Sequence, residues 1–242
     1  MQEAVFILQQ YEPPEGYYLA FSGGKDSLVC YWLCKLANVR FDAHYNYTTI
    51  DPPELVRFVR TFDDVEIVKP DTCYWQLIIK NGMPPTRLAR YCCKELKEQG
   101  GKERIKILGV RAEESSKRKG REVVMLDGSP LGRCINLIYH WTESEVWEFI
   151  GCNMIEYCSL YDEGFSRLGC IACPQKRAKA QERDFARWPA YRRAYVRCFD
   201  LMIAERQRKG LSCQWQTGED VLFWWLYGNK RNSNQLEMEW KT

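Results

Sequence analysis

The sequence contains little of what directs a chain to a membrane or out of the cell. No run of about 18 consecutive apolar residues occurs, so we expect no membrane-spanning helix. The start, Met1-Gln2-Glu3-Ala4, lacks the basic region that precedes the apolar core of a signal peptide. Internal repeats and low-complexity tracts are also absent. We therefore expect a cytoplasmic protein.

Histidine is scarce, and the commonest phosphate-binding motif is missing. His44 and His140 are the only histidines, so there is no obvious histidine for acid–base catalysis. The Walker pattern, Gly-x-x-x-x-Gly-Lys followed by Ser or Thr, does not occur. This composition remains compatible with a reaction that depends more on positioning than on proton transfer.

The order of apolar runs predicts an α/β fold. A chain of 242 residues with 45% apolar residues can form one principal domain with a smaller appendage. Short β-rich runs alternate with helical segments up to residue 150, which favours a doubly wound, mostly parallel sheet with helices on both faces. We expect a nucleotide-binding domain at 1–150 and a cysteine-bearing loop with a basic helical region at 151–242. The expected strands are Tyr17–Phe21, Arg40–Tyr45, Val65–Val68, Ile105–Val110 and Cys134–Ile138.

Helix starts are expected after Ser27, Asp51, Cys73, Arg87 and Thr142. Asp51 and Thr142 each stand three residues before a Glu, which is the spacing of a capping box. From Ala178 to Arg208 the pattern predicts one or two helices interrupted at Pro189. The Trp224-Trp225 pair is interpreted as packing rather than as a platform for bases.

The run Ser22-Gly23-Gly24-Lys25-Asp26-Ser27 lies between an expected strand and an expected helix. Adjacent glycines let the backbone approach a polyphosphate, and the following helix presents free N–H groups to it. The Asp26 carboxylate would repel phosphates unless a divalent cation lay between them, so the run indicates a nucleotide with Mg²⁺. Gly109, near the carboxyl end of the expected strand Ile105–Val110, should lie close to the nucleotide. The alternative is a Ser/Gly turn that caps an ordinary helix.

Charge is unevenly distributed along the chain. Residues 171–210 carry a net charge of +7, whereas the remainder carries about −4. Such a segment suits nucleic acid or another anionic partner, and it equally suits the solvated face of a long helix.

Twelve cysteines without an export signal indicate metal or cluster ligation rather than disulfides. Cys92-Cys93 and Cys170-x-x-Cys173-Pro174 are the candidate ligands, because all-thiolate sets suit iron–sulfur clusters and zinc. Buried thiols without metal are a third interpretation, and Cys158 is a possible substitute ligand. The cysteines expected in the core are Cys30, Cys34, Cys134, Cys152 and Cys198.

The loop at residues 22–27 resembles the signature of the ATP pyrophosphatases, or PP-loop enzymes, of adenine-nucleotide alpha-hydrolase fold. The cysteine pattern is similar to that of the iron–sulfur branch of the adenylylsulfate reductases, within the phosphoadenosine phosphosulfate (PAPS) reductase family. The segment from Gly109 to Arg118 also looks like the Gly-x-Arg segment of that family. The likeness covers about Tyr17 to Pro174. It implies a [4Fe–4S] cluster on four cysteines: Cys92, Cys93, Cys170 and Cys173.

The resemblance fails at one place. Reductases of this family carry a nucleophilic cysteine in a Glu-Cys-Gly-(Leu/Ile)-His setting near the C-terminus, whereas this sequence ends Leu236-Glu237-Met238-Glu239-Trp240-Lys241-Thr242. Cys213 is the one late cysteine, and no neighbouring base would lower its pKa. Reductase activity is therefore disfavoured.

Without the reductase cysteine, the resemblance implies an ATP pyrophosphatase that adenylates an acceptor for sulfur transfer. Asp26 would hold Mg²⁺, Arg111 and Arg118 would stabilise developing negative charge, and Arg87 and Arg90 would contact the substrate. Similar proteins include ATP pyrophosphatase components of DNA phosphorothioation and, more distantly, cluster-bearing tRNA thiolases. The implied partners are ATP or a sulfonucleotide, a nucleic-acid acceptor and a cysteine desulfurase or other sulfur donor.

Three rival functions remain open at the level of sequence. One is reduction of adenylylsulfate or PAPS. The second is an ATP-dependent amide- or nitrile-forming enzyme with zinc in place of the cluster. The third is a non-catalytic nucleotide-sensing module.

Overall fold

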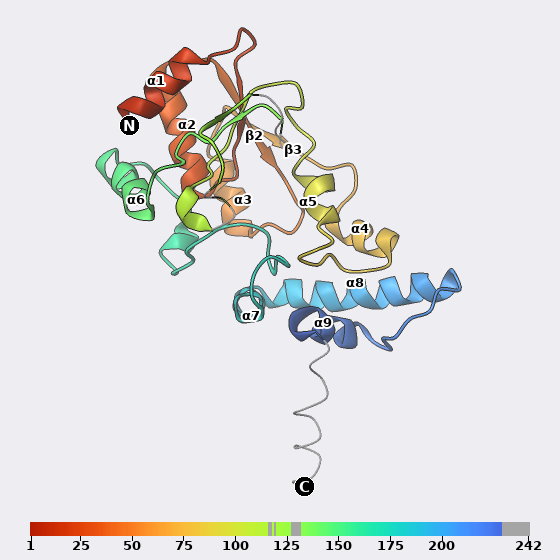
Figure 1. Ribbon diagram of the computed structural model, residues 1–242. Helices are drawn as coiled ribbons and strands as arrows, with labels where there is room; N and C mark the ends of the chain where they lie inside the picture. The colour runs from red at the N-terminus through yellow and green to blue at the C-terminus, as the bar shows by residue number, and fades with distance from the viewer. Residues whose placement is uncertain (116–117, 119, 127–131, 229–242) are drawn as a thin grey trace. The chain divides into compact units, whose positions relative to one another are not determined.

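The chain forms two compact units, each assembled from separate stretches of sequence. The computed structural model describes residues 1–115, 118, 120–126 and 132–228 (Figure 1). The sheet unit comprises Met1–Tyr47, Asp51–Lys69 and Gln99–Gly169; the helical unit comprises Thr48–Ile50, Pro70–Glu98 and Cys170–Thr242. The expected division into functional domains at residue 150 stays a prediction, and the compact units follow a different partition.

A six-stranded sheet forms the centre of the sheet unit. Its order is β3-β2-β1-β4-β6-β5, and every pairing is parallel except that of β5 with β6. The predicted α/β fold with a mostly parallel sheet is confirmed. The strands are β1 (Tyr17–Ala20), β2 (Phe41–Asn46), β3 (Val65–Val68), β4 (Lys106–Ile107), β5 (Val124–Met125) and β6 (Cys134–Ile135).

Helix α2 (Lys25–Ala37) is the next element after β1, and most of its apolar residues are buried, with Trp32 and Leu36 as the exposed exceptions. Both α1 (Gln2–Gln10) and α6 (Glu143–Cys152) pack against α2, so these three helices form one layer beside the sheet (Figure 1). The other helical elements of the unit are α3 (Pro53–Val59) and the 3₁₀ turns η1 (Ala112–Glu114) and η2 (Ser159–Tyr161). In the described residues no helix is long and apolar enough to cross a membrane.

Several elements differ from the sequence-based expectation. Strands β4 and β6 end earlier than predicted, and α1 and β5 were not predicted. Thr142 caps α6 through a capping box with Glu145, as expected. The capping role expected of Asp51 stays a prediction: α3 begins at Pro53 with Pro52 as its N-cap residue, and Asp51, just before it, is buried.

The helical unit contains α4 (Tyr74–Asn81), α5 (Tyr91–Leu96), α7 (Ala178–Arg187), α8 (Pro189–Arg208) and α9 (Gly218–Tyr227). The helix break expected at Pro189 is confirmed, since α7 ends at Arg187 and α8 begins at Pro189. Helix α8 packs against both α4 and α9. Tyr195 on α8 is fully buried, and the Trp225 ring stacks on it with centroids 5.2 Å apart, which confirms that this tryptophan packs.

The cysteines expected in the core are buried with one exception. Cys30, Cys34, Cys134 and Cys198 are buried, whereas Cys152 is exposed, so its assignment to the core was wrong. Cys152 is the last residue of α6, where the helix surface turns away from the core and the neighbouring positions 151 and 153 are exposed.

Gly218 permits the close approach of α9 to α8, and its replacement should destabilise the fold. A Cβ at this position would lie 2.2 Å from the backbone oxygen of Val196. We expect Gly218→Ala to lower the free energy of unfolding by about 1–3 kcal/mol, as overpacking does. The matched control is Gly151→Ala in α6, where a Cβ would meet nothing within 4 Å. Urea denaturation of both variants tests the packing; equal stabilities would contradict it.

Candidate functional site

The loop between β1 and α2 is ordered by its own serines. The Ser22 and Ser27 hydroxyls are 3.0 Å apart, and the Ser22 N–H donates to Ser27 Oγ at 3.1 Å. Gly23 has φ +71°, and a Cβ there would lie 2.7 Å from side-chain atoms of Leu55 and Val59 on α3. A side chain at position 23 is therefore excluded by backbone conformation and by packing.

The loop lies where the strand order changes direction. Strand β1 has β2 on one side and β4 on the other, and ligands of open α/β sheets bind at the carboxyl ends of such strands. A Cβ at Gly109, which follows β4, would lie 2.8 Å from the backbone carbon of Asp26 and 2.9 Å from the Ser27 nitrogen. The structure thus brings Gly109 against the first turn of α2, where the sequence analysis expected the two segments to converge.

Asp26 pairs with Arg111, which comes from the segment after β4. Arg111 Nε lies 2.6 Å from Asp26 Oδ1, and Arg111 Nη1 lies 2.6 Å from Glu113 Oε2. The Arg111 side chain is only 4% exposed. Burial opposes its charge, but the hydrogen bonds and charges of Asp26 and Glu113 raise the pKa of Arg111. The chain itself supplies positive charge beside Asp26, so neutralising this carboxylate does not require Mg²⁺.

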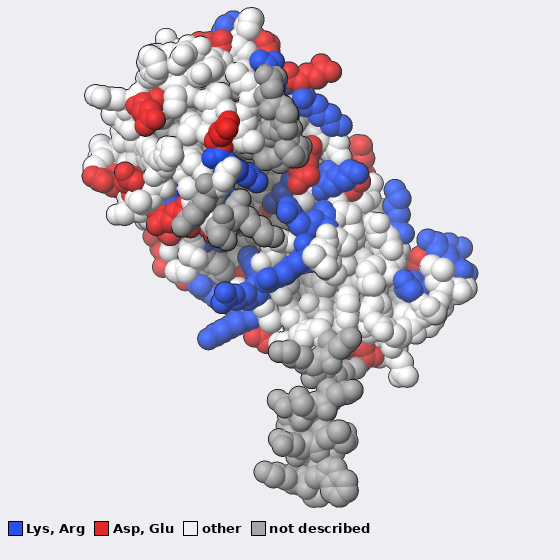
Figure 2. All heavy atoms as spheres, viewed as in Figure 1, with Lys and Arg blue, Asp and Glu red and all other residues white. Residues whose placement is uncertain are grey.

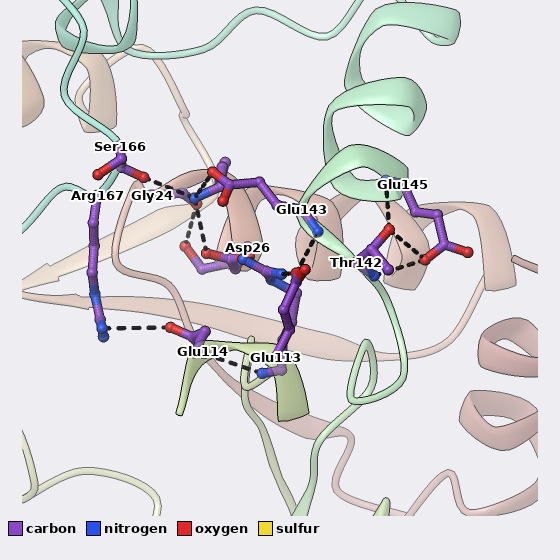
Figure 3. Close-up of polar contacts among 12 residues, drawn as sticks. Gly24, Asp26, Glu113, Glu114, Thr142, Glu143, Glu145, Ser166 and Arg167 are labelled. Atoms are coloured by element: carbon purple, nitrogen blue, oxygen red, sulfur yellow. Dashed lines mark hydrogen bonds and ion pairs between the residues drawn. The ribbon is translucent and has the colours of Figure 1, made fainter. Parts of the chain in front are cut away.

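Lys25 is buried and turned toward residues 161–166. Its Nζ donates to the Ser166 carbonyl at 2.9 Å and lies 3.4 Å from Glu143 Oε1, while its backbone N–H donates to the Tyr161 hydroxyl at 2.7 Å. Figure 3 labels Ser166 and Glu143 together with Gly24 and Asp26 of the loop. Sequence reasoning missed Tyr161 and Ser166, because their loop has no periodicity and no motif.

Basic side chains gather near Asp26. Arg118 is bonded to Glu114, and Arg167 Nη1 lies 3.5 Å from the other oxygen of that carboxylate (Figure 3 labels Glu114 and Arg167). Burial, together with repulsion from Arg167 and Arg121, lowers the pKa of Arg118 to about 10. Glu114 thus holds two arginines from different segments close to one another.

The four candidate cysteine ligands all belong to the helical unit. Cys92 and Cys93 lie on α5, and Cys170 and Cys173 close a turn in which the Cys173 N–H donates to the Cys170 carbonyl at 3.3 Å. Buried side chains hold that turn: Asp184 accepts from the Ala172 N–H at 2.7 Å, Gln181 donates to the Ala172 carbonyl at 3.1 Å, and Tyr195 donates to the Ile171 carbonyl at 3.0 Å.

The thiols of these cysteines influence one another. A hydrogen bond from Cys92, followed by one from Arg90, lowers the pKa of Cys93 to about 5. The same bond, burial and the charges of Cys93, Cys170 and Cys173 raise the pKa of Cys92. The donor set fits an iron–sulfur cluster or zinc in kind and number. Within the described ranges, however, no three His, Cys, Asp or Glu side chains converge closely enough to hold a metal ion.

The remaining predicted residues have separate surroundings. Cys158 belongs to the sheet unit and is buried, which raises the pKa of its thiol. Arg90 is near Cys93, whereas Arg87 Nη2 donates to the Lys176 carbonyl at 3.0 Å. The structure thus gives the two arginines different neighbours, although the sequence analysis had grouped them as one substrate contact.

The fold and the loop define an α/β nucleotide-binding protein of the PP-loop class. Residues 16–176 match the phosphoadenosine phosphosulfate reductase domain, and the chain belongs to that family. A crystal structure of PAPS reductase from Candida auris resembles it in fold, with a TM-score of 0.53 and 19% identity over 70% of this chain and 87% of that chain.

Curated relatives are similar over part of the chain. An uncharacterized protein of Methanocaldococcus jannaschii is 31% identical over 168 residues, which are 64% of this chain and 40% of that protein. An adenosine 5'-phosphosulfate reductase of Oceanobacillus iheyensis is 26% identical over 153 residues, 61% of this chain and 63% of the enzyme. The chain spans less than half the length of the first curated relatives it matches.

The Asp26 carboxylate is the only ionised group of the loop that can coordinate Mg²⁺. We expect Asp26→Asn to weaken ATP binding at least about tenfold in Mg²⁺, the scale of a lost hydrogen bond to a charged group. Binding in EDTA should change little, because Asn retains an oxygen for Arg111. Calorimetric titration with ATP measures the affinity in Mg²⁺ and in EDTA. Asp63→Asn, an exposed substitution in the same unit, is the control; unaltered binding by Asp26→Asn in Mg²⁺ would contradict this role.

Proposed function

We propose that the protein is an ATP pyrophosphatase that adenylates an acceptor for sulfur transfer. The observation that carries the proposal is the Asp26–Arg111 pair, which places a buried cation beside the Ser22–Ser27 loop. The repulsion among Arg118, Arg121 and Arg167 supports it, because a nucleotide polyphosphate is an anion that such a cluster binds. Membership of the PAPS reductase domain family supports an adenine nucleotide as the ligand.

In the proposed first step an acceptor oxygen attacks the α-phosphorus of ATP. The bond between the α-phosphorus and its bridging oxygen breaks, and pyrophosphate leaves with the electron pair. Ser22 is exposed and can donate its hydroxyl to the leaving group, while Arg111 and Arg118 stabilise charge on the transferring and leaving oxygens. Asp26 would hold Mg²⁺ on the phosphates, where it would share the carboxylate with Arg111.

In the proposed second step a sulfur nucleophile attacks the activated acceptor atom and AMP leaves with the acceptor oxygen. Cys92, Cys93, Cys170 and Cys173 would hold a [4Fe–4S] cluster, which supplies sulfur or electron chemistry when bound. Arg90 would keep Cys93 in the thiolate form that a ligand must have. The proposed partners are a nucleic-acid acceptor, supported by the +7 segment, and a cysteine desulfurase or other sulfur donor.

Sulfonucleotide reduction is the rival that the comparisons favour, since several relatives are adenosine 5'-phosphosulfate reductases. A reductase needs a cysteine that can move to the sulfate. Cys213 lies in the short connection between α8 and α9, two residues before the buried Trp215, and α9 packs on α8. This packing supports transfer over reduction.

Adenylation predicts that ATP is cleaved between its α and β phosphates. The expected products are AMP and pyrophosphate, detected by ion-exchange chromatography of [α-³²P]ATP reactions, with Asp26→Asn as the inactive control. Release of ADP and phosphate would contradict the proposal, and binding of ATP without any cleavage would favour nucleotide sensing.

Sulfur transfer and sulfonucleotide reduction should give different products. We expect no sulfite from adenylylsulfate or PAPS in the presence of thioredoxin, and unchanged pyrophosphate release by Cys213→Ser, because Cys213 takes no part in adenylation. Sulfite production that is abolished by Cys213→Ser would restore the reductase interpretation.

The proposed cluster predicts brown, iron- and sulfide-containing protein after anaerobic purification. Serine at Cys92, Cys93, Cys170 or Cys173 should each lower the iron content and the visible absorbance. Cys158→Ser is the matched control, because Cys158 lies in the sheet unit. Loss of iron in Cys158→Ser but not in Cys92→Ser would show that the ligand set is wrong, and zinc without sulfide would favour the amide- or nitrile-forming rival.

A further inference from the structure

The helical unit has a pocket of about 550 Å³ that no part of the adenylation mechanism uses. Its walls come from the loop before α5, from the segment after Cys173 and from α9. This volume lies in the range of small-molecule sites and can accept one nucleotide. The lining residues that carry the argument are Arg87, Pro174, Lys176, Arg177, Trp224 and Trp225.

The pocket walls are tied together by hydrogen bonds. Arg87 Nη2 donates to the Lys176 carbonyl at 3.0 Å, and Gln175 Nε2 donates to the Arg87 carbonyl at 3.3 Å. On the opposite wall the Trp225 indole donates to the Pro85 carbonyl at 2.6 Å. The three segments therefore form a fixed frame rather than a chance gap between loops.

The charge of the lining selects an anion. Arg87, Lys176 and Arg177 line the pocket, and its described lining contains no Asp or Glu. Lys176 is bound to the buried Asp184, but neither Arg87 nor Arg177 forms an ion pair with another described residue. Arg177 also precedes the first turn of α7, which has no side-chain cap and adds the positive end of a helix dipole.

The aromatic wall selects a flat, apolar group beside that anion. Trp224 is partly exposed and contacts Trp215 with ring centroids 5.0 Å apart, while Trp225 is fixed against Tyr195. Cationic side chains that track phosphates, together with aromatic rings on which bases stack, are the usual elements of single-strand nucleic-acid sites. Figure 2 shows where Lys and Arg side chains gather on the face that it draws.

We propose that this pocket binds one nucleotide of a single-stranded nucleic acid, with the base against Trp224 and its phosphate against Arg87 and Arg177. The inference deepens the proposed function and depends on it, since it names the acceptor as a nucleic-acid strand. Pro174 joins the pocket directly to Cys173, and Asp184 bonds both Lys176 and the Ala172 N–H. A bound strand therefore lies beside the turn that carries Cys170 and Cys173.

The test measures binding of short fluorescent single-stranded RNA and DNA by anisotropy, without ATP. We expect Arg177→Ala to weaken binding and to reduce the salt dependence of log Kd by about one. Trp224→Leu, which keeps an apolar group against Trp215, should weaken binding at least about fivefold and reduce the quenching of tryptophan fluorescence. Arg197→Ala, an exposed arginine of α8 outside the pocket, is the matched control. Circular dichroism confirms that each variant is folded.

The outcomes separate this inference from the proposed function. Equal affinities of Arg177→Ala, Trp224→Leu and Arg197→Ala would overturn the pocket assignment, as would stronger competition by an acidic peptide than by an unlabelled oligonucleotide. The nucleic acid that binds with the lower Kd, RNA or DNA, identifies the kind of strand that the pocket accepts. Because binding is measured without ATP, a protein that binds strands but fails to release pyrophosphate would disprove adenylation alone.

Discussion

The buried contact between Asp26 and Arg111 is the interaction on which the candidate site depends. It joins the first turn of α2 to the segment after β4, two stretches brought side by side only by the strand order of the sheet. Arg111 also bonds Glu113, so two carboxylates from different segments share one buried guanidinium. Gly109 makes the same approach possible from the backbone side. The site is therefore preorganised by packing, and the loop does not have to be ordered by its ligand.

The pair also changes the electrostatic reasoning about the loop. From the sequence alone, a carboxylate among phosphate-binding residues called for a divalent cation. In the structure, Arg111 and Lys25 lie beside that carboxylate. Arg118, with its neighbours Arg121 and Arg167, adds further positive charge nearby. Fixed cations in a site of low dielectric act without reorganisation, which is the property that the proposed adenylation would use to stabilise a leaving pyrophosphate. Mg²⁺ would then orient the phosphates rather than neutralise Asp26.

Local features were the ones that the sequence predicted well. The strand–loop–helix around residues 17–37, the capping box at Thr142 and the helix break at Pro189 depend on neighbours within a few residues. Features that depend on distant packing were missed or wrong. Cys152 has apolar neighbours but is exposed, and Arg167 approaches Glu114 only through the tertiary fold. No periodicity marks such contacts.

The helical unit is built from chain segments on both sides of β4, β5 and β6. During synthesis, Cys92 and Cys93 leave the ribosome well before Cys170 and Cys173, at a rate of about 5–20 residues per second. Helix α4, which packs against α8, must likewise wait for the second half of the chain. Any metal centre on these four cysteines would thus be completed only late in the synthesis of the chain.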